Sequence, residues 1–172
     1  MGRIVTRENF REIYYDVFQK FDDQLGILTT GTIHDFRCLT IGWGMMGNVW
    51  GHPGSALTVY VSPSRYTFEY LQKNEYFSVC FMPTEYHEDV MLLGGLSGRD
   101  GDKVSRTRLI SKALTQGVGF EQAELTFVCR KLGAQQFDLN CVPDRMREGL
   151  YRQVEPHYMY IGEIVDAFGE MK

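Results

Sequence analysis

Three short stretches of the sequence combine glycines with polar or charged side chains at spacings suited to a bound ligand. In the first, residues 40–47, three glycines flank Trp43 with the spacing G-x-G-x-x-G. Residues 48–50 follow in place of a helix with an acidic residue at ribose distance, which excludes a dinucleotide-binding fingerprint. The glycines leave the backbone on both sides of Trp43 open to a planar ligand, although a glycine-rich bulge or barrel corner has the same composition.

The second stretch, residues 61–67, runs from a strand through a proline into a predicted helix. The first turn of a helix has free N–H groups and the positive end of the helix dipole, and both attract an anion. Two hydroxyls and one guanidinium accompany them here. We therefore take Ser64, Arg65, Tyr66 and Thr67 as candidate phosphate ligands, with an ordinary capped helix and a solvated arginine as the alternative.

The third stretch, residues 97–103, is a polar turn that follows an apolar run. Its two glycines, one of them Gly98, permit a backbone nest for an anion. The hydroxyl of Ser97 and the ammonium group of Lys103 suit the same anion. A plain surface turn is the alternative interpretation.

The elements that must position these stretches are mainly strands. Short segments rich in aromatic and β-branched residues, bounded by Gly or Pro, predict six strands. They are residues 24–30, 36–43, 55–61, 76–82, 125–132 and 158–165. Apolar spacing and start signals predict helices at residues 10–21, 66–73 and 85–93. Predicted strands outnumber predicted helices two to one. This favours a mainly β protein, a small barrel with peripheral helices, over a doubly wound parallel sheet.

Length and composition limit the class of protein further. The chain of 172 residues, with 44% hydrophobic residues and a net charge of −4, is expected to form one folded domain over residues 1–172. It has no long block of like charges, so nucleic acid and an anionic membrane surface are not expected partners. Any anionic ligand must therefore be held by a local site.

The cysteines and histidines predict neither a metal site nor a catalytic side chain. The four cysteines form no C-x-x-C pair and no zinc spacing with histidine, so each is expected to pack as a small buried thiol. They are Cys38, Cys80, Cys129 and Cys141. No two of the four histidines have metal spacing, and His157, near the start of a predicted strand, is weighed mainly as a structural residue.

The N-terminal residues and the longest apolar runs bear on localisation. The first 26 residues carry many charges, which leaves no room for a secretory segment. No apolar run approaches the length that spans a membrane. A reducing cytoplasm is the expected compartment.

Five blocks of the sequence, in this order, resemble the flavin reductase-like, FMN-binding split-barrel family, which includes flavoredoxin. The blocks are residues 39–44, 50–53, 63–67, 97–103 and 157–164. They cover about residues 24–166, so the resemblance is more specific than any single motif.

The resemblance implies a six-stranded split β-barrel, a homodimer and one non-covalent FMN per subunit. It implies that the isoalloxazine and ribityl regions contact four residues, largely through their backbone: Thr40, Ile41, Gly42 and Trp43. The residues that it assigns to the phosphate are Arg65, Thr67, Ser97, Gly98 and Lys103, with Ser64 and Tyr66 in the same block. The predicted helix start at residues 61–67 indicates part of this set without the family.

Two departures from the family pattern concern the cofactor. Cys38 and Leu39 stand where many relatives carry Asn and Met, which removes an amide that would bond to the flavin. Ser62 stands where relatives tend to carry Arg, which removes one guanidinium beside the phosphate.

The resemblance implies an FMN-dependent oxidoreductase, in which hydride passes from NAD(P)H to the flavin. Electrons then pass to free flavin, a metal chelate or a partner protein. Two alternatives remain: a flavoredoxin-like electron carrier without NAD(P)H oxidase activity, and a degenerate barrel that binds no FMN and acts as an interaction module.

Overall fold

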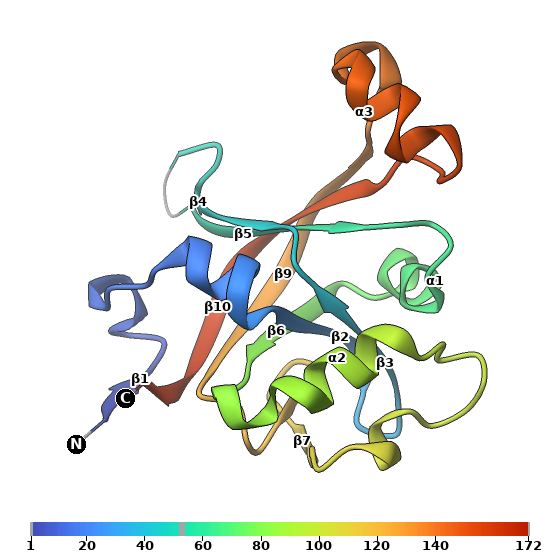
Figure 1. The fold of residues 1–172 in the computed structure, drawn as a ribbon. Helices are drawn as coiled ribbons and strands as arrows, with labels where there is room; N and C mark the ends of the chain where they lie inside the picture. The colour runs from blue at the N-terminus through green and yellow to red at the C-terminus, as the bar shows by residue number, and fades with distance from the viewer. Residues whose placement is uncertain (1, 52–53, 172) are drawn as a thin grey trace.

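An eight-stranded antiparallel sheet forms the centre of the computed structural model, which describes residues 2–51 and 54–171. Its strand order is β3-β2-β6-β9-β10-β5-β4, and β1 pairs with β10 (Figure 1). The strands are β1 Arg3–Val5, β2 Gly26–Thr32, β3 Asp35–Ile41, β4 Gly44–Asn48, β5 Ser55–Val61, β6 Tyr76–Phe81, β9 Leu125–Gln136 and β10 Tyr158–Met171. Among the described strands β3 and β4 are the unpaired ends of this order, so the sheet is an open, split barrel.

The six predicted strands are confirmed as β2, β3, β5, β6, β9 and β10. Four further strands were not predicted. They are β1, β4 and the separate hairpin of β7 (Ser111–Ala113) and β8 (Val118–Phe120). Three of these have only three residues, and β4, with the sequence GMMGN, lacks the β-branched and aromatic residues that mark a strand.

Strands β9 and β10 are longer than predicted because they continue past the body of the sheet. The first five residues of β9 are buried, whereas the remaining residues are partly or fully exposed. The two strands pair along this whole length, with register shifts at two places in β10. In Figure 1 their paired ends form an arm with α3 (Asp144–Glu148) at its tip.

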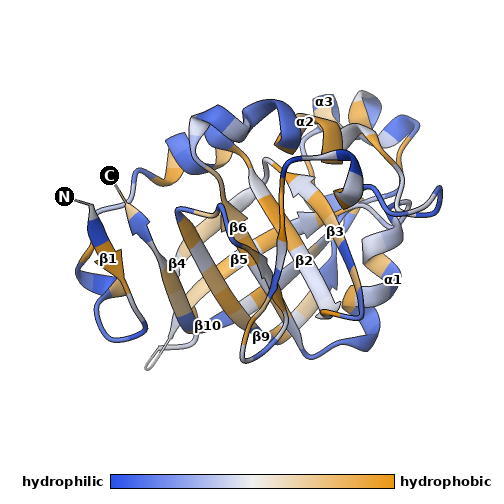
Figure 2. Cartoon of the chain, turned by 90° about the horizontal axis from the view of Figure 1, so that it is seen from below, coloured by the Kyte–Doolittle hydropathy of each residue, from blue (hydrophilic) through white to orange (hydrophobic). Residues whose placement is uncertain are grey.

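Large aromatic side chains fill the core on the inner face of the sheet. Phe77, Phe81, Phe127 and Tyr160 are all fully buried, and the Tyr160 hydroxyl accepts a hydrogen bond of 2.6 Å from Gln72 Nε2. Figure 2 shows apolar residues concentrated on the strands, while the helical segments are mixed.

One glycine is required by the close packing of this core. A Cβ at Gly162 would lie 2.5 Å from the Phe77 ring and 2.7 Å from Cys129 Cβ. Because neither neighbour can yield that much space, only glycine fits at this point of β10.

The helices pack around the sheet. Helix α1 spans Tyr66–Lys73, as predicted, and α2 spans His87–Gly95 after a 3₁₀ turn at Thr84–Tyr86, close to the predicted range. Other short helical turns are η1 Phe10–Glu12, η2 Gln19–Gln24, η4 Val104–Arg106, η5 Leu139–Cys141 and η6 Leu150–Arg152. Among the described residues, no helix is long and apolar enough to cross a membrane.

The predicted helix over residues 10–21 is wrong. The segment forms the 3₁₀ turn η1, an extended stretch from Ile13, and then the π-helical turn η2. Phe10 and Tyr15 both contact the Phe127 ring, at centroid distances of 6.1 and 5.6 Å, a spacing of five that one helix face does not provide. Phe18, which the helical pattern would bury, is exposed.

The prediction of four buried thiols holds for three cysteines and is wrong for the fourth. Cys38, Cys80 and Cys129 are buried in the sheet, and burial raises the pKa of Cys38 to about 11 and that of Cys80 to about 12. Cys141 is exposed, because it belongs to the η5 turn on the arm and not to a strand.

Candidate functional site

The three stretches contribute residues to two cavities, which are lined by residues on either side of Ile41, the last residue of β3. A polar cavity of about 260 Å³ is lined by residues 38–40, 64–67 and 94–98 and by Lys103. It therefore contains Thr40 from the first stretch, all four candidates from the second, and Ser97, Gly98 and Lys103 from the third. Residues that are far apart in the sequence are brought together as the anion argument requires.

At the start of α1, the second stretch presents an open helix end to the polar cavity. Arg65 is the N-cap residue with an extended backbone, and no side-chain hydrogen bond caps this described helix. The Ser62 and Ser64 hydroxyls lie 2.9 Å apart and bond to each other. The Arg65 side chain is exposed, so its guanidinium remains available to a ligand together with the N–H groups of the first turn.

Two threonines of the predicted site hold the end of β3 in place. Thr67 Oγ1 donates a hydrogen bond of 3.0 Å to the carbonyl of Cys38, which links α1 to β3. Thr40 Oγ1 donates a bond of 2.6 Å to the carbonyl of Val90, which links β3 to α2. Both hydroxyl protons are therefore used within the protein, and only hydroxyl lone pairs remain.

Lys103 donates its hydrogen bonds at this site to backbone carbonyls of the protein. The residue is 8% exposed, and its amine donates bonds of 2.8 Å to the carbonyl of Leu93 and 3.3 Å to that of Leu96, at the C-terminal end of α2. A cation suits this end of the helix dipole. Burial, and then the charge of Arg65, lower the pKa of Lys103. Its assignment to a bound phosphate stays a prediction.

Arg99 fastens the third stretch onto the second. Its guanidinium donates a 3.2 Å bond to the carbonyl of Ser64, forms an ion pair with Glu69 and stacks over the Tyr66 ring at 4.8 Å. Arg106, by contrast, is exposed in η4 and lines none of the described cavities.

A larger, apolar cavity of about 1230 Å³ is lined by Gly42 and Trp43, two and three residues after Thr40 of the polar cavity. Ile41, between the two cavities in sequence, is 3% exposed and packs into the core, so its side chain contacts neither. Only its backbone is available to a ligand. A Cβ at Gly44 would overlap the Phe21 ring, which explains a glycine next to Trp43.

His157 packs against two residues that line the apolar cavity. Its ring lies 4.6 Å from the Trp43 ring and 5.8 Å from that of Tyr151. Nδ1 of His157 is buried without a hydrogen-bond partner among the described residues. Burial, and then the charge of Arg65, lower the pKa of His157 and so favour the neutral imidazole.

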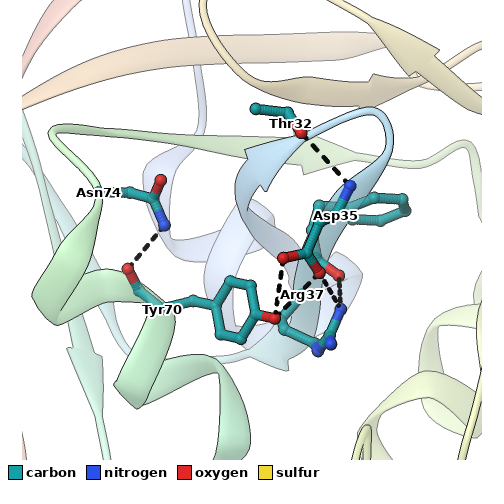
Figure 3. A network of polar contacts seen from close by, with 6 residues as sticks. Thr32, Asp35, Arg37, Tyr70 and Asn74 are labelled. Atoms are coloured by element: carbon teal, nitrogen blue, oxygen red, sulfur yellow. Dashed lines mark hydrogen bonds and ion pairs between the residues drawn. The ribbon is translucent and has the colours of Figure 1, made fainter.

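A second arginine, which was not predicted as a site residue, also stacks on Tyr66. Arg37 stacks over the rings of Tyr66 and Tyr70 at 4.9 and 4.4 Å and pairs with Asp35 at 3.0 Å. Tyr70 donates a bond of 2.9 Å to the same carboxylate (Figure 3). The tyrosine pair at i and i+4 of the predicted helix was the available signal.

The described residues contain no group of His, Cys, Asp and Glu that can hold a metal ion, and none of the predictions required one.

No family model matches the sequence, and the search of curated proteins found no match. Solved structures match strongly. Flavoredoxin from Methanosarcina acetivorans is 22% identical with a TM-score of 0.65, over 86% of this chain and 68% of that protein. The FMN-binding protein from Thermus thermophilus with bound 1-cyclohex-2-enone is 18% identical with a TM-score of 0.66, over 91% of this chain and 76% of that protein.

An FMN-binding domain of a flavin reductases-like enzyme from Shewanella baltica matches as well. It is 11% identical with a TM-score of 0.64, over 98% of this chain and 78% of that one. At these identities the likeness is one of fold. The chain thus has the split-barrel fold of flavoredoxin and the flavin reductase-like proteins, as its five sequence blocks predicted.

Proposed function

We propose that this protein binds FMN without a covalent bond and acts as a flavin-dependent oxidoreductase. The observation that carries the proposal is the pairing of two cavities along one strand end. The polar cavity has a size suited to a phosphate, and the apolar cavity beside Trp43 has a size suited to a ring system. Structural neighbours described as FMN-binding support the same cofactor.

The spacing of the two cavities suits the length of the cofactor. Thr40 lines the polar cavity and Trp43 the apolar one. Three residues of extended chain separate them by roughly 10 Å. A ribityl chain laid along this backbone would join a phosphate near Arg65 to an isoalloxazine ring near Trp43.

Each part of the chain then has a task. The bound flavin supplies hydride-accepting chemistry, which needs no protein acid or base for the transfer itself. Arg65 and the first turn of α1 hold the phosphate, and the backbone at residues 40–43 orients the ring. NAD(P)H is the proposed hydride donor, and free flavin, a metal chelate or a partner protein is the proposed acceptor.

The phosphate assignment is tested by FMN titration of Arg65→Ala. Loss of a charge-assisted hydrogen bond costs about 1.5–3 kcal/mol, so we expect affinity to fall about 10- to 100-fold. Arg106→Ala is the matched control, since it removes the same charge from an exposed position outside the cavity. Equal affinity for FMN in the two variants would refute the phosphate site. A purified protein without flavin absorbance that also fails to quench FMN fluorescence would refute the cofactor and favour an interaction module.

A flavoredoxin-like electron carrier is the second candidate, favoured by the match to flavoredoxin. Anaerobic mixing of the FMN-loaded protein with NADH or NADPH separates the two. Bleaching of the flavin supports the reductase, and persistent colour supports the carrier.

We also propose a homodimer, because one chain leaves large apolar side chains in solvent. Trp50 and Leu132 are exposed, and the Trp50 ring lies over β9 beside Gly133. Sedimentation velocity tests the dimer, with Trp50→Glu as the variant expected to weaken it. A monomer at every concentration would rule it out.

A further inference from the structure

The apolar cavity beside Trp43 is larger than one ligand needs. Sites for single small ligands have volumes of about 300–1,000 Å³, whereas this cavity has about 1230 Å³. If the flavin ring of the proposed function occupies the part at Gly42 and Trp43, space remains toward the arm. Residues 137–151, between β9 and β10, form the far wall of that space.

The walls of the remaining space are aromatic and adaptable. Tyr60 and Phe137 stack with ring centroids 5.4 Å apart and an interplanar angle of 22°, and Tyr151 lies edge-on to Phe137 at 6.5 Å. Four methionines complete the lining: Met45, Met46, Met146 and Met159. Flat aromatic surfaces favour a planar guest, and methionines adjust to guests of different outline.

The charges of the lining have one sign. Asp22 and Asp138 are its ionisable carboxylates, and no Lys, Arg or His is among the described lining residues. Both carboxylates are exposed at the edge of the cavity, and an anion placed there would face them without gaining a cationic partner among the lining residues. This cavity therefore differs from the polar one, where Arg65 and Lys103 supply positive charge.

We propose that this cavity binds an uncharged planar aromatic molecule that serves as the electron acceptor, an assignment that rests on the proposed function for its redox step. In that step, reduced FMN (FMNH₂) and a quinone give oxidised FMN and the hydroquinone. Two electrons and two protons pass from the flavin to the two quinone oxygens. The two carboxylates disfavour anionic acceptors of the same outline.

The test compares two planar quinones that differ in charge, 2-(hydroxymethyl)anthraquinone and anthraquinone-2-sulfonate. In an anthraquinone every carbon of the central quinone ring is a carbonyl or a ring-fusion carbon, so the exposed thiol of Cys141 cannot add to it. Calorimetric titration is made with flavin-free and with FMN-loaded protein. We expect the neutral quinone to bind both forms, at least about 10-fold more tightly than the sulfonate, because burial of an unpaired charge costs several times RT.

Three variants assign the binding to this cavity. Phe137→Ala removes a wall and is expected to weaken neutral quinone binding about 10-fold, while Phe168→Ala, outside the cavity on β10, is its matched control. Asp138→Asn is expected to raise affinity for the sulfonate several-fold and to leave that for the neutral quinone unchanged. Circular dichroism confirms that each variant is folded.

Equal affinity for the two quinones, or no binding of either, would overturn the inference. If the protein takes FMN and the neutral quinone binds the flavin-free form but not the FMN-loaded form, quinone and flavin compete for one place, and the inference is overturned as well. Binding that appears only after dilution to monomer would mean that a second copy of the chain covers the cavity, and would overturn it too. FMN binding without quinone binding removes this inference alone. Quinone binding by a protein that takes no FMN supports the cavity assignment and removes the proposed function.

Discussion

The polar and apolar cavities share one strand end but are built in opposite ways. The polar cavity is held by hydrogen bonds between distant segments, such as Thr67 to the Cys38 carbonyl and Lys103 to the end of α2. The apolar cavity is lined by side chains that contact one another through ring faces and thioethers, as Tyr60 does with Phe137 and Met45. The first is expected to be rigid and selective, and the second to be adaptable.

The two cavities also differ in whether their residues mainly stabilise the fold or are free to bind a ligand. In the polar cavity most of the polar atoms already have partners in the protein, so their loss costs stability before it costs affinity. Arg65 is the exception, since its side chain is exposed and its guanidinium makes no hydrogen bond or ion pair within the described residues. In the apolar cavity, residues such as Val142 and Met146 are only partly buried, so changes there are expected to alter ligand choice with little cost to the fold.

Lys103→Met is expected to give the largest change in the unfolding free energy. The variant leaves the carbonyls of Leu93 and Leu96 without their buried donor, which costs about 1–3 kcal/mol of unfolding free energy in urea denaturation. Lys112→Met, at an exposed position of β7, is the matched control and should stay within about 0.5 kcal/mol of the parent. Similar stabilities for both variants would mean that Lys103 is not a structural support.

Thr67→Val gives an intermediate effect. It removes the bond from Thr67 to the Cys38 carbonyl and leaves a buried acceptor unpaired, which costs about 1–2 kcal/mol. Val142→Ala in the wall of the apolar cavity is the comparison, and we expect it to cost less than about 1 kcal/mol because the side chain is only half-buried. A lower urea midpoint for Val142→Ala than for Thr67→Val would contradict the difference in rigidity between the two cavities.

The fold was largely predictable because its central strands carry strong local signals. Residues 55–61 and 66–73 were predicted with the observed bounds of β5 and α1, since strand composition and a helix start are both local features. The N-terminal segment was not predictable in this way. Its aromatic residues fit a helical period, but Phe10 and Tyr15 contact one ring of a strand more than a hundred residues away.

The site was predictable in its polar half only. Arg65 and Ser97 belong to stretches whose glycines, hydroxyls and charges are unusual, so they stand out in the sequence. The walls of the apolar cavity do not, because Phe137 and Met146 have the composition of any core residue. Their shared cavity depends on the path of the arm between β9 and β10, which is a property of the tertiary structure. Trp43, marked by its glycines, was the one local clue to that cavity.

The smallest expected effect concerns His157, which packs against Trp43 and Tyr151 of the apolar cavity. Burial and the charge of Arg65 lower its pKa below the ordinary value of 6.5, so the unfolded chain takes up a proton at a pH where the folded one does not. Stability must therefore fall as pH drops through 6.5 toward the lower pKa of the folded state. His157→Gln cannot bind this proton, and we expect a smaller loss of Tm between about pH 7.5 and about pH 5.5 than in the parent. His34→Gln, at an exposed turn position, is the matched control for loss of an imidazole.

Arg65→Ala tests the second cause of the low pKa of His157. Because this variant removes the charge of Arg65, the NMR titration midpoint of His157 should rise toward 6.5. An unchanged midpoint would mean that the charge of Arg65 does not affect the pKa of His157. It would then contradict an electrostatic link between the polar and the apolar cavity.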